Sequence, residues 1–288
     1  METLTRNTLH KTTRQDLLSR LADAFRDTYV YPETGLLLHD TLQMWREEET
    51  PEDQDTAAWC KGLTRRLRAL VPDLHLNVFP RTVEETRGQA VHQGVQKFEY
   101  LAGNVAYVDL RGFFEPESAV PMLDAVMTLA RPAKGLIIDL RKNGGGSGET
   151  VAYLCSHLLA ARTHLQSFTE RGSDFKRQSW TLPYLPHRDT EKPVVVLISK
   201  HTGSAAEEFA YNLKALKRAT LIGETTAGAA HTVNIISLND EVGAFIPTGH
   251  PISPYTEGHW EGVGVTPDIE VKSEEALEKA LEHLQSLP

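Results

Sequence analysis

The chain has 288 residues, of which 40% are hydrophobic and 24% charged, and its formal net charge is −9 at pH 7. This composition is typical of one large globular domain, or of one large and one small domain. The negative charge and the lack of a Lys/Arg run argue against nucleic acid or an anionic membrane as a partner. Small molecules or peptides fit better.

Cys60 and Cys155 lack the spacing of a disulfide or metal motif, so we expect both to be reduced. The first residues contain no apolar segment of the signal-peptide kind, and no stretch is long enough to span a membrane. We therefore expect a cytoplasmic protein, although a chain that had lost a leader would look the same.

Three runs with helical spacing of apolar residues lie between residues 13 and 71. A Tyr-Pro pair and an acidic, proline-containing stretch separate them. We therefore expect a small three-helix domain over residues 1–74. Residues 74–78 alternate as a short strand does, and His75 lies where the helical pattern ends. A lone histidine in this position is more often structural than catalytic.

The rest of the chain alternates between strand and helix patterns. We expect a surface connection over residues 81–96, a hairpin of residues 97–101 and 105–110, a β-excursion over residues 164–181, strands over 233–238 and 243–247, and a final helix over 274–287. Between residues 135 and 223, buried strands over 136–140, 193–198 and 219–223 alternate with helices. This order predicts an α/β fold with parallel pairing.

Ser204 lies where the buried strand of residues 193–198 gives way to a helix. The start of a helix has unpaired N–H groups and the positive end of its dipole, which would stabilise an oxyanion beside Ser204. The alternative is a capping box formed with Glu207, and this stretch alone favours the cap. Thr202 and Ala206 occupy the outer positions of the G-x-S-x-G motif, which disfavours an α/β-hydrolase.

A run of glycines, residues 144–146, follows the strand that ends near residue 140. It matches neither the dinucleotide-binding motif nor the P-loop, so we expect no nucleotide site. Such glycines let backbone N–H groups approach a ligand oxygen, as in an oxyanion hole, but a plain strand-to-helix turn has the same pattern. The twelve histidines show no metal-ligand spacing, and we expect no metal or other cofactor.

Four stretches occur in the order of a known family: DLH at 73–75, DLRKNGGG at 139–146, GSAAEEF at 203–209, and GETT at 223–226 leading to EGVGVTPD at 261–268. Together they resemble the tail-specific, or C-terminal processing, serine peptidases. The most similar branch is that of interphotoreceptor retinoid-binding protein and the tricorn core protease. The resemblance implies a ClpP/crotonase-like ββα core over residues 75–288. We expect no PDZ domain, because the segment between His75 and the hairpin is too short for one.

The resemblance also implies Ser204 as the nucleophile. The general-base lysine of the processing-peptidase branch corresponds to Ala229, which excludes a Ser–Lys dyad at that place. The tricorn-like branch uses a histidine and a glutamate that correspond to His75 and Glu261. The implied roles are general base and orienting carboxylate, and His231 is the rival base.

The implied oxyanion donors are the N–H groups of Gly145 and Ala205, with Gly144 or Gly146 as alternatives to the first. Glu207 is expected to cap the helix, with a catalytic role as the secondary alternative. The expected function is peptide-bond hydrolysis through an acyl-enzyme. The alternatives are a non-catalytic binder of retinoids or fatty acids, and an esterase or thioesterase. The expected partner is a peptide or a small acyl substrate, and the fold is compatible with a homo-oligomer.

Overall fold

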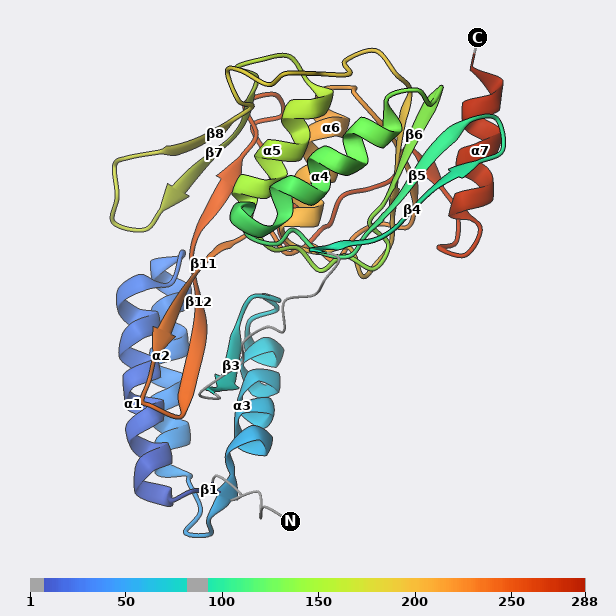
Figure 1. Cartoon of the computed structure of the whole chain (residues 1–288). Coiled ribbons are helices and arrows are strands. Elements are labelled where there is room, and N and C mark those ends of the chain that lie inside the picture. Colours follow the sequence, from blue (N-terminus) through green and yellow to red (C-terminus); the bar gives the residue numbers. More distant parts are fainter. Residues whose placement is uncertain (1–7, 82–92, 288) are drawn as a thin grey trace. The chain divides into compact units, whose positions relative to one another are not determined.

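The computed structural model describes residues 8–81 and 93–287 and divides the chain into two compact units (Figure 1). The first unit contains residues 1–86, 168–176 and 231–250, and the second contains residues 87–167, 177–230 and 251–288. The expected boundary after residue 74 differs from this division, because three separate segments build the first unit. The expected surface connection over residues 81–96 lies mostly outside the described residues.

The first unit contains the three helices that the apolar spacing predicts: α1 (Lys11–Thr28), α2 (Pro32–Glu47) and α3 (Thr56–Leu70). Two short strands, β1 (Thr8–Leu9) and β2 (Gln54–Asp55), pair antiparallel. A β-ribbon completes the unit, in which β12 (Val242–Ile252) pairs antiparallel with both β11 (Thr232–Ser237) and β3 (Asn77–Pro80).

The core of the first unit joins its helices to the ribbon. Alternate residues of a strand share one face, and residues 242, 244 and 246 of β12 are all buried in one apolar cluster with Leu21 of α1 and Leu67 of α3. The apolar stripes of the helices are therefore covered partly by side chains that occur more than 150 residues later in the chain.

The second unit is built on a six-stranded sheet in the order β13-β10-β9-β6-β5-β4. Its strands are β4 (Val95–Leu101), β5 (Val105–Leu110), β6 (Gly135–Asp139), β9 (Val194–Ile198), β10 (Thr220–Gly223) and β13 (Ile269–Glu270). Only β4 pairs antiparallel, with β5. The remaining strands are β7 (His164–Glu170), which runs from the second unit into the first, and β8 (Arg177–Trp180).

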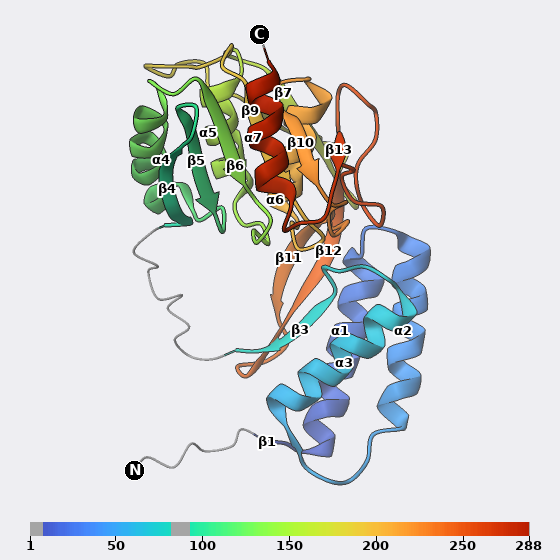
Figure 2. The same ribbon diagram turned by 90° about the vertical axis from the view of Figure 1, so that its right-hand side faces the viewer.

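Helices cover both faces of this sheet (Figures 1 and 2). One face packs against α4 (Pro116–Ala130), α5 (Gly148–Leu158) and α6 (Ala205–Ala215), and the other against α7 (Ala276–Ser286). The expected α/β class with parallel pairing is confirmed. In the part of the chain that the structure describes, no helix is both long and apolar enough to cross a membrane.

The sheet register brings three loops to one edge. Asp139 at the end of β6 lies opposite Leu197 of β9, and Ile198 lies opposite Gly223 at the end of β10. Parallel strands direct their following loops to the same side, which is where α/β proteins usually place their ligand sites. The loops that follow β6, β9 and β10 therefore leave this edge together.

Candidate active site

Ser204 is held in an unusual backbone conformation at the start of α6. It is the N-cap residue, with φ 52° and ψ −122°, and α6 begins at Ala205 as the sequence predicts. A residue other than glycine held at such angles typically costs about 1–3 kcal/mol, and such residues cluster at active sites. The conformation favours a role for Ser204 beyond capping.

Glu207 connects the start of α6 to the loop that follows β10. Its side chain is fully buried. Oε1 accepts hydrogen bonds from Thr226 Oγ1 (2.5 Å) and the Gly228 N–H (2.7 Å), and Oε2 from the N–H groups of Ser204 (2.8 Å) and Ala229 (2.9 Å). Burial raises the pKa of Glu207, and these hydrogen bonds oppose the rise. The capping contact expected of Glu207 is present, and it also fixes the neighbouring loop.

Gly145 brings the glycine loop against the serine. Its φ is 109°, and a Cβ there would lie 2.8 Å from Ser204 Cβ, so only glycine fits. The Gly145 N–H, however, donates to Asn143 Oδ1 (2.9 Å), and the Asn143 amide is fixed by the Leu110 carbonyl (3.0 Å). The Gly145 N–H therefore has a side-chain partner in this structure, and its expected role as an oxyanion donor stays a prediction.

The other expected donors differ in their surroundings. Ala205 is the first residue of α6, where backbone N–H groups have no partner within the helix. A Cβ on Gly144 would meet no described atom within 4 Å, whereas one on Gly146 would lie 1.9 Å from the Phe113 carbonyl oxygen. Gly146 is thus packed against other backbone. The assignment of the donors to Ala205 and Gly144 stays a prediction.

A buried aspartate and histidine form a pair within the first unit. Asp73 Oδ2 lies 2.7 Å from His231 Nδ1, and the two residues are 3% and 5% exposed. Oδ2 also accepts from the Tyr29 hydroxyl (3.0 Å), and Oδ1 from the His75 N–H (2.9 Å). Burial acts to raise the pKa of Asp73, but the hydrogen bonds from His231, His75 and Tyr29 hold it below its usual value.

No role for Asp73 was predicted from the sequence. Aspartate favours Asx turns, in which its carboxylate accepts from the N–H two residues later, and this tendency could have drawn attention to Asp73. His75 is half-buried, and burial lowers its pKa. In the second unit, Glu261 Oε2 accepts from the Ala230 N–H (2.6 Å). The expected pairing of His75 with Glu261 stays a prediction.

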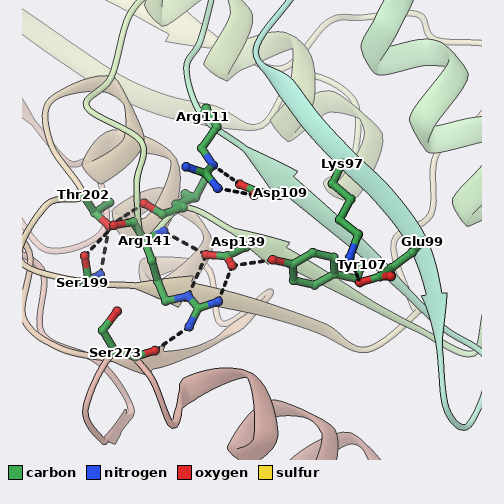
Figure 3. A network of polar contacts seen from close by, with 11 residues as sticks. Lys97, Glu99, Tyr107, Asp109, Arg111, Asp139, Arg141, Ser199, Thr202 and Ser273 are labelled. Carbon is green, nitrogen blue, oxygen red and sulfur yellow. Dashed lines mark hydrogen bonds and ion pairs between the residues drawn. The ribbon is translucent and has the colours of Figure 1, made fainter. Parts of the chain in front are cut away.

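A polar network supports the two loops that carry the glycines and Ser204 (Figure 3). Arg141 binds both carboxylate oxygens of Asp139 (2.9 and 2.6 Å), and the Tyr107 hydroxyl donates to the same carboxylate (2.7 Å). The Ser199 hydroxyl donates to the Arg141 carbonyl (2.7 Å), and Thr202 Oγ1 donates to the carbonyl that precedes Arg141 (2.8 Å). The loops after β6 and β9 are therefore bonded directly to each other.

Comparison with known proteins gives one consistent family. Residues 104–271 match the profile of Peptidase family S41. The carboxy-terminal-processing protease of Bartonella bacilliformis is 30% identical over 177 residues, which are 60% of this chain and 40% of that protein. The tricorn protease of Thermoplasma volcanium is 34% identical over 94 residues, 33% of this chain and 8% of that protein.

The fold also has solved counterparts. A lipoprotein from Streptococcus agalactiae superposes with a TM-score of 0.72 at 17% identity, over 95% of this chain and 96% of that one. At this identity the likeness shows the fold alone. The chain spans less than half the length of the curated relatives named above.

Proposed function

Because the chain belongs to peptidase family S41, we propose that it is a serine peptidase with Ser204 as its nucleophile. One observation carries the proposal: the backbone of Ser204 is held at positive φ at the N-terminus of α6, directly against the glycine loop. Such a site offers N–H groups and a helix dipole to the negative charge that develops during acyl transfer. We propose peptides as the substrate class.

In the proposed reaction, His75 accepts the hydroxyl proton of Ser204 while Oγ attacks the carbonyl carbon of the scissile bond. The carbonyl oxygen becomes an oxyanion, which the N–H groups of Ala205 and Gly144 stabilise. Each such donor typically contributes about 3 kcal/mol. The C–N bond then breaks as His75 gives its proton to the leaving amine, and water hydrolyses the ester on Ser204.

The base is assigned to His75, with Glu261 as its orienting carboxylate. A general base must be unprotonated at working pH, and burial lowers the pKa of His75, which favours the neutral ring. His231 is the second candidate, since its Nδ1 is bonded to Asp73 as the histidine of a catalytic triad is bonded to its aspartate.

Intact-mass analysis after fluorophosphonate treatment tests these roles. We expect one adduct on the wild type, none on Ser204→Ala or His75→Ala, and on His231→Ala an adduct that forms more slowly than on the wild type. An adduct that persists on Ser204→Ala would refute the nucleophile. An adduct kept on His75→Ala and lost on His231→Ala would transfer the base to His231. Cleavage of a peptide library, compared with activated esters, then separates a peptidase from an esterase.

A further inference from the structure

We infer that Asp73 is a positioning residue for His75, and that His231 acts by holding Asp73 rather than by taking a proton from Ser204. The inference rests on the proposed function, because it takes His75 as the base. Its evidence is a set of contacts within the first unit, in which one carboxylate receives donors from three parts of the chain.

The first oxygen of Asp73 fixes the backbone that carries His75. Asp73 begins a tight turn between α3 and β3, in which the Leu76 N–H donates to the Asp73 carbonyl (3.2 Å). The His75 N–H donates to Asp73 Oδ1 (2.9 Å), which makes the segment an Asx turn. The backbone position of His75, and with it the placement of its imidazole, therefore depends on the orientation of the Asp73 carboxylate.

The second oxygen determines where that carboxylate points. Oδ2 accepts a hydrogen bond from His231 Nδ1 (2.7 Å), just before β11, and another from the Tyr29 hydroxyl (3.0 Å), at the end of α1. An ionised carboxylate only accepts hydrogen bonds, so the shared proton belongs to His231 Nδ1. A buried carboxylate without such donors would take up a proton or turn away, since burying an unpaired charge is costly.

His231 is itself held in place. It is 5% exposed, and the edge of the Tyr31 ring packs against it with ring centroids 5.6 Å apart. An asparagine at position 231 can replace the hydrogen bond that His231 Nδ1 donates to Asp73. Its amide nitrogen lies at about the same place along the side chain as Nδ1. The basic ring nitrogen of histidine has no such replacement. An asparagine at position 231 therefore distinguishes a role of His231 as hydrogen-bond donor from a role as general base.

The matched pair His231→Asn and His231→Leu tests the inference. Asparagine keeps a donor for Asp73 but cannot act as a base, and leucine removes both functions. With an activated ester as the substrate, we expect His231→Asn to stay within about threefold of the wild-type kcat/KM. We expect His231→Leu to lower kcat by about 10- to 100-fold with KM unchanged. A cooperative thermal unfolding transition in each variant is the control for correct folding.

Two results would overturn the inference. Equal large losses in both variants would mean that the imidazole itself is required, and full activity in both would mean that the bond to Asp73 has no role. Neither result resembles a failure of Ser204 as the nucleophile, because in that case the wild type would carry no fluorophosphonate adduct on Ser204.

A pH profile adds a readout that a merely structural role would not change. The charged groups that act on His75 are Asp73, which raises its pKa, and His231 and Arg68, which lower it. Asp73→Asn removes the first of these, so we expect the acid limb of kcat/KM to move to lower pH. Tyr29→Phe removes a donor without changing charge and should leave the limb in place. An unmoved limb in Asp73→Asn would overturn the inference.

Discussion

Glu208, on α6, has a buried carboxyl group with incomplete hydrogen bonding. It is 6% exposed, and its Oε1 has no hydrogen-bond partner among the described residues. Burial raises the pKa of Glu208 to about 8, while Arg177 acts to lower it and Glu149 to raise it further. At neutral pH the folded protein therefore holds a proton that the unfolded chain releases. We predict that Glu208→Gln, which removes the ionisation and nearly keeps the shape, changes how stability depends on pH.

The size of the effect follows from the two pKa values. The pKa of Glu208 rises from 4.5 to about 8, so folding favours its protonated form. This stabilisation is fully present below the unfolded pKa, and it declines with rising pH until the folded pKa is reached. The loss is about 1.4 kcal/mol per pH unit in that window, or about 3 kcal/mol between about pH 5.5 and about pH 7.5.

Urea unfolding of the wild type and Glu208→Gln across this pH range measures the difference. We expect the free energy of unfolding of Glu208→Gln, relative to the wild type, to rise by about 3 kcal/mol over the two units. Glu117→Gln, at an exposed position on α4, is the matched control and should show no such trend. If the wild type and Glu208→Gln kept parallel curves, Glu208 would not be protonated in the fold, and the argument from burial would fail.

Three further predictions concern the loops around Ser204. Ser204→Gly should be about 1 kcal/mol more stable to urea than Ser204→Ala, because glycine adopts a φ of 52° without strain; equal midpoints would contradict the strain. Gly145→Ala places a methyl group 2.8 Å from Ser204 Cβ and should slow fluorophosphonate labelling by about 100-fold, so an unchanged rate would count against a close approach of the two loops. Thr202→Val removes a hydroxyl that donates to the Leu140 carbonyl and accepts from the Ser199 N–H, and it should lower the free energy of unfolding by about 1–3 kcal/mol. A smaller loss would show that these buried groups find other partners.

The helices and longer strands were predictable because their signals are local. The helical spacing of apolar residues predicted the three N-terminal helices, and short continuous runs of apolar residues, such as that of β9, predicted the buried strands. The strands β1, β2 and β13 have two residues each, too few for any periodicity, and exist only through their pairing. The division into units was not predictable either, because it depends on how β12 pairs with β3, about 165 positions earlier in the chain.

The candidate site was predictable where it follows from motifs. The family resemblance is confirmed by the match over residues 104–271, and Ser204 lies at the start of α6 as expected. The hydrogen bond from the Gly145 N–H to the Asn143 side chain was not predictable, because it depends on how the loop folds back. The pair of Asp73 and His231 joins residues 158 positions apart, and no periodicity or spacing rule relates such residues.

The interrupted first unit has a consequence for the order in which the chain folds during synthesis. The three N-terminal helices leave the ribosome long before residues 242–246, which complete their core. Until then the faces of α1 and α3 that contain Leu21 and Leu67 lack their strand partner. A nascent chain that ends before residue 231 should bind an apolar dye that the full chain excludes, and dye binding that is absent from such chains would show that the helices protect themselves.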